Sequence, residues 1–267
     1  MFQAIRTFRA KLAEGRFCLG VGITLNDPAV TESLGRHADF FWVDLEHTAL
    51  GMESLQAHLM AARAVNVPAL VRVPGSETWF IKRVLDTGAN GLIVPQVRSA
   101  EEVKRVVDAC RYKPLGDRGY GPRRASNYGA DQHYLDTANK DLFVAVQIEN
   151  MDALAEVESI AAIPGLDSLV LGPFDLAASM GFLGKPDHSQ VQAAIKHVIG
   201  VAKSRGLKVG MGGPAQEDYA FRAAQTGVDW LQCGSDFEYM SQFIGPFFGR
   251  LHAKLSGGPV PGSTSPS

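Results

Sequence analysis

Short apolar runs alternate along the chain with segments of helical periodicity. Most of these runs are unbroken stretches of Val, Ile, Leu or Phe, which is typical of parallel strands buried on both faces. The predicted strands span 18–23, 40–45, 69–73, 91–94, 142–148, 168–171, 208–211 and 228–233. Eight strands that alternate with helices over about 250 residues predict an α/β fold, a single-domain (β/α)8 TIM barrel. The alternative is an open doubly wound sheet, but residues 22–27 after the first strand are not the glycine-rich dinucleotide fingerprint of that fold.

Capping residues indicate where several helices begin and end. Asp27 with Pro28 starts one predicted helix, and Ser99 starts another. Three helices are expected to end shortly before a strand at a C-cap glycine, namely Gly88, Gly206 and Gly227.

The two ends of the chain add segments to the barrel. An amphipathic helix is expected within residues 1–16, with an apolar face made of Ile5, Phe8 and Leu12. An organelle transit peptide is the alternative for this segment. A further helix is expected at 237–255, and its aromatic residues either cover the barrel bottom or dock on a neighbouring subunit. We therefore expect a barrel domain over 1–255 and a disordered tail over 256–267, because a tail of Gly, Pro, Ser and Thr buries too little surface to offset its ordering entropy.

Residues 111–140 form an interval that is too long for a simple connection between strands. It is polar and rich in Gly, Arg and Tyr. Long loops in compact domains are usually functional or disordered, so we expect an ordered active-site or interface loop. A solvated surface loop is the alternative.

Composition and charge exclude several classes of function. The chain has 267 residues with 26 basic and 28 acidic side chains, and the resulting net charge of −2 argues against a nucleic-acid binder. No apolar run approaches the roughly 20 residues that span a bilayer, so no membrane partner is expected. The three cysteines lie far apart and have no metal-type spacing, which indicates reduced thiols in a cytoplasmic protein.

The active site of such a barrel forms at the carboxyl ends of its strands. Polar and ionisable residues collect at these ends of otherwise apolar runs. They are Asp44, Glu46, His47, Arg72, Gln96, Gln147, Glu149, Asp175 and Asp236. Burying such groups near a barrel mouth is costly unless they pair with something.

Two of these carboxylates, Glu149 and Asp175, follow adjacent predicted strands. They would repel each other unless a cation lies between them. Oxygen ligation by two carboxylates, with positions left for water and substrate, suits Mg²⁺ or Mn²⁺. The alternative is that each is salt-bridged or caps a helix, with Asp175 capping the segment 176–180.

His47 and Arg72 each allow two interpretations. His47 is either a general base or a hydrogen-bonded structural residue. Arg72 either binds a carboxylate or polarised carbonyl, or bridges to Asp44 or Glu46. No lysine ends a predicted strand, so an imine-forming aldolase is not expected, and carbanion chemistry would depend on a metal.

Six sequence blocks together resemble the HpcH/HpaI aldolase family over roughly residues 4–255. They are VDLEH at 43–47, VRVPG at 71–75, GANGLIVPQV at 88–97, RGYGPRRAS at 118–126, VQIEN at 146–150 and LGPFDLAASMG at 171–181. The resemblance implies a class II pyruvate aldolase, similar to 4-hydroxy-2-oxoheptanedioate aldolase, that uses Mg²⁺, Mn²⁺ or Co²⁺. Such an enzyme reversibly cleaves 4-hydroxy-2-oxo acids through an enolate. The products are an aldehyde and pyruvate or a related 2-oxo acid such as hydroxypyruvate, in the catabolism of aromatic compounds or sugar acids.

The resemblance also implies roles for individual residues. Glu149 and Asp175 are the expected metal ligands, His47 the base, and Arg72 the residue that stabilises the enolate oxygen. Asp86 matches the acid that pairs with the base, within or across subunits. The remaining implied roles are substrate binding at Gln147, Gly172, Pro173, Phe174, Asp175, Met211 and Gly212, and support of the site by Asp44 and Glu46.

Two departures from the family concern specificity. Phe174 stands where small residues are common, and residues 210–214 are glycine-rich where relatives carry bulkier apolar residues on the aldehyde side. Family members resemble hexamers built from two trimers with exchanged C-terminal helices, so a homo-oligomer is expected. Two alternatives remain: a phosphosugar isomerase or epimerase, suggested by the glycine loops 210–213 and 233–236, and a non-catalytic barrel that binds oxo acids.

Overall fold

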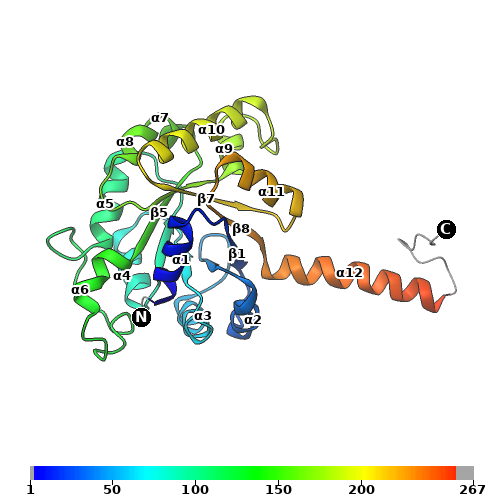
Figure 1. The fold of residues 1–267 in the computed structure, drawn as a ribbon, viewed down its shortest axis with the longest axis horizontal. Helices are drawn as coiled ribbons and strands as arrows, with labels where there is room; N and C mark the ends of the chain where they lie inside the picture. Colours follow the sequence, from blue (N-terminus) through cyan, green and yellow to red (C-terminus); the bar gives the residue numbers. More distant parts are fainter. Residues whose placement is uncertain (1–2, 257–267) are drawn as a thin grey trace.

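Eight parallel strands close into a barrel in sequence order, as the periodicity predicts (Figure 1). The computed structural model describes residues 3–256. The strands are β1 Cys18–Ile23, β2 Phe40–Asp44, β3 Ala69–Arg72, β4 Gly91–Val94, β5 Phe143–Ile148, β6 Ser168–Leu171, β7 Lys208–Gly213 and β8 Trp230–Ser235. The helices are α1 Gln3–Ala13, α2 Pro28–Leu34, the 3-10 turn η1 Gly35–His37, α3 Met52–Ala64, α4 Thr78–Asp86, α5 Ala100–Cys110, α6 Tyr134–Asp141, α7 Met151–Ala155, α8 Val157–Ala161, α9 Pro173–Ser179, α10 Ser189–Ser204, α11 Glu217–Thr226 and α12 Asp236–Leu255. The predicted disordered tail lies outside the described residues except for Ser256.

The predicted capping residues are confirmed. The Asp27 side chain accepts a hydrogen bond from Ala29 N at the start of α2, and Ser99 accepts one from Glu102 N in α5. Gly227 ends α11 with a φ of 101°, a left-handed conformation that glycine adopts without steric cost.

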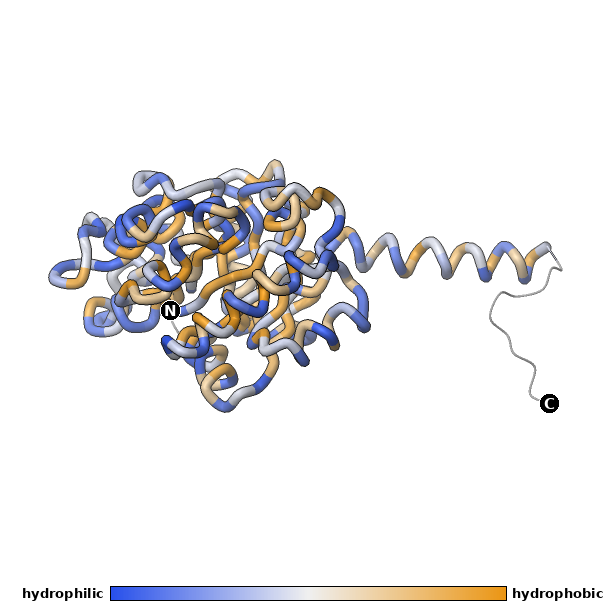
Figure 2. The backbone as a smooth tube through the Cα atoms, turned by 90° about the horizontal axis from the view of Figure 1, so that it is seen from above, coloured by the Kyte–Doolittle hydropathy of each residue, from blue (hydrophilic) through white to orange (hydrophobic). Residues whose placement is uncertain are grey.

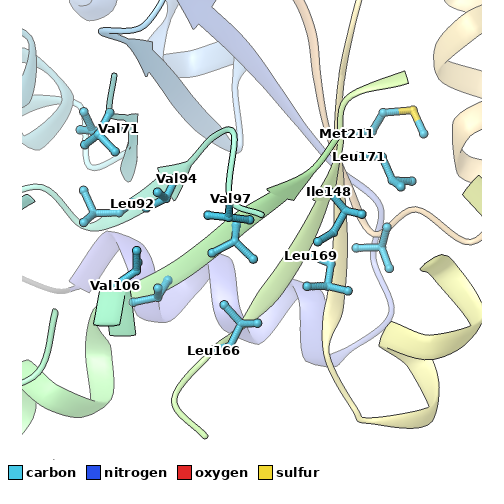
Figure 3. Close-up of a cluster of buried hydrophobic side chains, with 14 of the residues drawn as sticks. Val71, Leu92, Val94, Val97, Val106, Ile148, Leu166, Leu169, Leu171 and Met211 are labelled. Atoms are coloured by element: carbon cyan, nitrogen blue, oxygen red, sulfur yellow. The ribbon is translucent and has the colours of Figure 1, made fainter. Parts of the chain in front are cut away.

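The core has two layers that follow the alternation of side chains along each strand. One apolar cluster lies between the barrel and its helices and includes Val71, Ile148, Leu169 and Met211 (Figure 3). A second cluster fills the barrel itself with large side chains, namely Phe40, Trp42, Leu70, Ile93, Phe143, Val170 and Trp230. These large residues fit because neighbouring inward positions are small: a Cβ at Gly210 would lie 2.3 Å from the Trp230 ring. The lower interior is therefore solid, and a pocket can form only above it.

Helix α1 closes the amino-terminal end of the barrel. Its predicted apolar residues Ile5, Phe8 and Leu12 are all buried. The Phe8 ring lies 5.3 Å from the ring of Phe40 and 5.7 Å from that of Phe143, so it joins the aromatic cluster inside the barrel. The open mouth is therefore at the carboxyl ends of the strands, where the site residues were predicted.

The long segment between α5 and α6 is fixed by buried arginines. Arg111 donates to the carbonyls of Leu142 and Gly165, and Arg124 donates to those of Leu59 and Thr87. Because this segment leads from a helix into β5, it lies at the amino-terminal ends of the strands, opposite the mouth. Within one chain it is an ordered loop away from the mouth, so of the two predicted roles, active-site loop and interface loop, the interface role stays a prediction.

Helix α12 projects away from the barrel instead of packing against it (Figures 1 and 2). It does not cover the barrel bottom, where α1 already lies, so that alternative for 237–255 is wrong. Asp236 is the only residue of α12 that is buried. Its carboxylate accepts hydrogen bonds from Thr24 and from Leu25 N, which anchors the start of α12 to the loop after β1.

Among residues 3–256, none of the helices combines the length and apolar character that crossing a lipid bilayer requires.

Candidate active site

A pocket of about 300 Å³ opens at the barrel mouth. Most of its walls come from the ends of strands or from the residues that directly follow them. The lining residues are Trp42, Arg72, Gln147, Leu171, Gly172, Pro173, Phe174, Asp175, Gly212, Gly213, Pro214, Gln232, Ser235 and Glu238. The pocket therefore brings together Arg72, Gln147, Asp175 and Gly212, which the sequence assigned to the site.

Arg72 lies at the end of β3 with its guanidinium held by two acids. Its Nε and Nη2 donate to the Asp44 carboxylate at 2.9 and 2.8 Å, and Nη1 lies 3.0 Å from Glu46 Oε2. The guanidinium also stacks 5.4 Å from the centre of the Trp42 ring. Both interpretations of Arg72 are therefore compatible: Asp44 accepts from two of its five N–H donors, Glu46 adds an ion pair, and Arg72 still lines the pocket.

Glu149 is buried directly behind the pocket wall. Its Oε1 accepts hydrogen bonds from the backbone N and the side chain of Gln96 at 2.7 and 3.0 Å, and its Oε2 accepts one from Gln147 at 2.5 Å. Gly172 packs on it so closely that a Cβ there would lie 2.5 Å from Glu149 Oε2. Burial raises the pKa of the Glu149 carboxyl to about 7, against the lowering effect of the Gln96 hydrogen bond, and the charges of Asp175 and Glu46 raise it further.

Neither Glu149 nor Asp175 forms an ion pair within the described chain, so the salt-bridge alternative is wrong for both. Asp175 does not cap a helix at 176, because α9 already begins at Pro173 and places Asp175 in its first turn.

The donor atoms near these carboxylates fit a hard divalent cation. Burial also raises the pKa of the Glu46 carboxyl to about 7, as it does for Glu149. These acids share the mouth, and Arg72 is the cation beside them. Gln147 Oε1 is buried and accepts no hydrogen bond from residues 3–256. In the same range, no three His, Cys, Asp or Glu side chains gather closely enough to hold a metal ion unaided. A cation here would thus be held by two carboxylates with substrate or water completing its shell, which suits Mg²⁺ or Mn²⁺.

The end of β6 leads directly into α9 beside the pocket. Pro173 has no N–H, so the first free backbone donors of this helix are those of Phe174 and Asp175, as the family pattern implies. The Phe174 side chain is half exposed and lines the pocket.

His47 and Asp86 lie at opposite ends of the barrel in one chain. His47 follows β2 at the mouth, with its side chain 62% exposed and its Nε2 3.5 Å from Glu46 Oε2. Asp86 ends α4 near the amino-terminal ends of the strands and pairs with Arg118 at 2.9 Å. The predicted pairing of Asp86 with His47 is therefore absent from residues 3–256 of a single chain, and it requires a second copy.

Met211 does not line the pocket. It faces outward into the cluster between barrel and helices, where Tyr219 hydrogen-bonds to its sulfur (Figure 3). Side chains alternate along a strand, so Gly210 and Gly212 face inward and Met211 cannot. The predicted contact of Met211 with substrate is therefore wrong, whereas Gly212 does line the pocket.

The structure adds residues that sequence reasoning left without a role. Gln96 orients Glu149 and has a φ of 57°, which is uncommon for a residue other than glycine. Trp42 and Gln232 line the pocket from inside their strands. A glutamine within an apolar run, on the inward face near the end of a strand, is the signal that could have identified Gln232.

The glycines that suggested a phosphate site have a packing role. A Cβ at Gly213 would lie 2.1 Å from the Tyr219 ring, and one at Gly234 would lie 2.4 Å from Ala215 Cβ. These close contacts explain why glycine stands at both positions, and no phosphate site is needed to explain them. The sequence motif that suggested a phosphosugar isomerase or epimerase therefore no longer supports that alternative.

Comparison with known proteins finds related aldolases. The chain is 40% identical over 212 residues to a hydroxypyruvate/pyruvate aldolase of Paraburkholderia phytofirmans, covering 76% of this chain and 81% of that protein. It is 38% identical over 244 residues to a 4-hydroxy-2-oxovalerate aldolase of Rhodococcus jostii, covering 91% and 94%. A crystal structure of an HpcH/HpaI aldolase/citrate lyase family protein from Burkholderia cenocepacia superimposes with a TM-score of 0.87 at 30% identity, covering 92% of this chain and 99% of that one. Residues 20–241 match the family as a whole, and the chain belongs to the HpcH/HpaI aldolase/citrate lyase family.

Proposed function

We propose that this protein is a divalent-metal-dependent pyruvate aldolase. It reversibly cleaves 4-hydroxy-2-oxo acids to an aldehyde and pyruvate, or a related 2-oxo acid such as hydroxypyruvate. The observation that carries the proposal is the grouping, at one pocket, of a fixed guanidinium, a buried amide oxygen and two carboxylates. Within residues 3–256 the amide oxygen has no hydrogen-bond donor and neither carboxylate has an ion pair. The two relatives compared above support the aldolase part of the proposal, since one is named a hydroxypyruvate/pyruvate aldolase and the other a 4-hydroxy-2-oxovalerate aldolase.

The cation held by Glu149 and Asp175 would supply positive charge beside the 2-oxo group. Mg²⁺, Mn²⁺ and Co²⁺ are the candidates. The backbone N–H groups of Phe174 and Asp175, together with Gln147, are placed to orient the 2-oxo acid. Arg72 keeps N–H donors for the substrate oxygen because its hydrogen bonds to Asp44 use only Nε and one N–H of Nη2.

Cleavage begins when a base removes the proton of the C4 hydroxyl. His47 is the proposed base, acting directly or through water. The O–H electrons form the aldehyde carbonyl, the C3–C4 bond breaks, and its electron pair becomes the enolate of pyruvate. Arg72 hydrogen-bonds to the enolate oxygen, and protonation at C3 completes the reaction. A preorganised donor of this kind is worth about 10²–10³ in rate.

The protein is further proposed to act as a homo-oligomer, a hexamer of two trimers. Helix α12 leaves nine large apolar side chains exposed, namely Phe237, Tyr239, Met240, Phe243, Ile244, Phe247, Phe248, Leu251 and Leu255. A second copy of the chain is the proposed cover, since exposed apolar surface of this extent is characteristic of an interface. The same assembly would allow Asp86 of one chain to approach His47 of another.

A cytoplasmic location is part of the proposal. Cys18, Cys110 and Cys233 are all unpaired, and burial raises the pKa of the Cys18 thiol to about 11, so this thiol is unreactive.

The reaction is tested by measuring pyruvate release from 4-hydroxy-2-oxo acids before and after treatment with a chelator. We expect activity to disappear on metal removal and to return with Mg²⁺, Mn²⁺ or Co²⁺. Activity that survives complete metal removal, together with a pyruvate adduct trapped by borohydride, would contradict the proposal because it would indicate an imine.

A further inference from the structure

One side of the pocket is left unassigned by the proposed reaction. Arg72, Gln147 and residues 172–175 serve the 2-oxo-acid half of the substrate. The remaining polar lining comes from the ends of β7 and β8 and the start of α12. We call this group the β8 wall; it consists of Gly212, Gln232, Ser235 and Glu238.

Gln232 occupies the inward layer directly above the solid interior of the barrel. Trp230, two residues earlier on β8, fills that interior. Gln232 pairs in register with Gly20 of β1 and Gly212 of β7, so neither neighbour places a side chain over it. Its side chain is therefore the first polar group above the aromatic floor at this part of the pocket.

The space beside Gln232 Oε1 is open. A Cβ at Gly212 would lie 3.1 Å from Gln232 Oε1, and the described chain has no other heavy atom within 4 Å of that point apart from the immediate chain neighbours. A Cβ at Gly22 would lie 2.9 Å from Gln232 Nε2, so Gly22 also leaves room for this side chain. The space beside Gly22 is taken up by the amide together with Ser235 and Gly234, so the room for an atom of the substrate lies on the Gly212 side, next to Gln232 Oε1.

The hydrogen bonds of Gln232 determine which group fits that space. Its Nε2 donates to Gly234 O at 2.6 Å, which fixes the amide. Its Oε1 accepts no hydrogen bond from residues 3–256, and it faces the open space above Gly212. An acceptor of this kind requires a donor from the substrate, such as a hydroxyl group.

The rest of the β8 wall disfavours an anionic substrate group. Glu238 is acidic, and one of its oxygens is engaged by Ser235 N at 2.6 Å. The Ser235 side chain accepts from the backbone of Glu238 in a capping box. A carboxylate offers only acceptors, and the β8 wall contains no lysine or arginine to receive it.

We propose that Gln232 is a specificity residue that accepts a hydrogen bond from a hydroxyl group on the aldehyde half of the substrate. The substrate class is then a 4-hydroxy-2-oxo acid whose aldehyde fragment is a neutral hydroxyaldehyde. This inference rests on the proposed aldolase function.

The test is the aldol addition of pyruvate to glycolaldehyde and to propanal, which have the same number of heavy atoms and differ by a hydroxyl in place of a methyl group. Because the two aldehydes differ in intrinsic reactivity, the measured quantity is the ratio of their kcat/KM values in each protein. We expect Gln232→Met, which keeps the length of the side chain but removes its acceptor, to lower this ratio by about 5- to 10-fold. The matched control is Gln56→Met on the exposed surface of α3, which should leave the ratio unchanged.

A second variant and a second readout cover the case in which Gln232→Met disturbs the site. Exchange of the pyruvate methyl protons with deuterated water requires no aldehyde and reports on the 2-oxo-acid half alone. If exchange persists in Gln232→Met and the aldehyde ratio is unchanged, the proposal is wrong. If exchange is lost in Gln232→Met, Gln232→Asn becomes the deciding variant. Asparagine keeps a polar amide but withdraws it by one methylene. The ratio of kcat/KM for glycolaldehyde to that for propanal must therefore fall in Gln232→Asn as well.

Two outcomes with the wild-type protein separate the inference from the proposed function. Formation of no aldol with any aldehyde overturns the proposed function and the inference together. Efficient aldol formation with a preference for glyoxylate, which carries a carboxylate in place of the hydroxymethyl group, overturns the role of Gln232 and leaves the aldolase function intact.

Discussion

Neighbouring side chains fix the positions of the key residues at the mouth. Arg72 is fixed by Asp44 and Glu46, and Glu149 is fixed by Gln96 and Gln147. A side chain held in this way loses little entropy when substrate binds, so its full interaction energy is available to the transition state. The site thus depends on supporting contacts as well as on the groups that face the pocket.

Arg72→Lys tests the value of the fixed guanidinium. A lysine keeps the positive charge but cannot make the two-point hydrogen bond to Asp44 while presenting further donors to substrate. We expect kcat for cleavage to fall about 10²–10³-fold with the fold intact. The effect is measured by steady-state kinetics of Arg72→Lys and of Arg105→Lys, a control at an exposed position. Equal activity of the two variants would show that the Arg72 guanidinium does not stabilise the transition state.

His58 is a buried residue that does not line the pocket, and it makes the free energy of unfolding depend on pH. It is fully buried with its Nδ1 2.8 Å from Thr31 Oγ1, and burial lowers its pKa, although Leu25, Asp236 and Asp27 act in the opposite direction. The unfolded chain takes up a proton at this histidine below about pH 6.5, whereas the folded chain resists protonation, so the free energy of unfolding falls as the pH decreases. This loss is absent well above pH 6.5.

Urea unfolding at pH 7.5 and pH 5.5 measures the contribution of His58. We expect His58→Gln to lose less stability than the wild type between these two pH values. His197→Gln is the control, because His197 is half exposed and pairs with Glu158 on the surface. A pH dependence in His58→Gln equal to that of the wild type would contradict the assignment.

At the scale of elements, the strands and their ends could be predicted because short unbroken apolar runs between polar segments are typical of strands buried on both faces. Glu149 and Asp175 were placed at the same mouth on that ground, and they lie there. The position of Met211 was missed because a shift of one residue along a strand reverses the face of the side chain. Asp86 lies at the end of α4, away from His47, and the sequence pattern could not establish whether the two residues meet across subunits.

Helix α1 is predicted to act as a structural plug rather than as part of the site. Phe8→Ala should destabilise the fold by about 3–5 kcal/mol, because it opens a cavity beneath Phe40 and Phe143. Kinetic constants measured well below the unfolding temperature should be unchanged, since the pocket lies at the other end of the barrel. Chemical denaturation measures the free energy of unfolding of Phe8→Ala and of Thr7→Ala, a control on the exposed face of α1. A mild loss of stability in Phe8→Ala would contradict this structural role of α1.

At the scale of the whole molecule, the described chain leaves helix α12 largely uncovered. Only Asp236 is buried along the 20 residues of α12, and Asp86 lies at the opposite end of the barrel from the histidine it was expected to support. Sequence pattern identified the helix but could not establish what covers it, because an apolar face is the same whether it packs on its own barrel or on another copy.

The assembly prediction concerns the apolar residues of α12. We expect the wild-type chain to behave as a hexamer in light scattering coupled to gel filtration. The double substitution Phe243→Lys with Phe247→Lys should produce smaller species with reduced activity, because charges on this face oppose its burial. Ser241→Lys at an exposed polar position of the same helix serves as the control, and a monomeric wild type would exclude subunit sharing.

The most direct measurement of the central claim is a titration of the metal-free protein with Mn²⁺, followed by electron paramagnetic resonance. The account predicts one Mn²⁺ bound per chain in the wild type, with binding weakened at least tenfold in Glu149→Gln and in Asp175→Asn, and pyruvate release that rises in proportion to the bound Mn²⁺. Unchanged binding in both variants, or full activity in the metal-free protein, would contradict it.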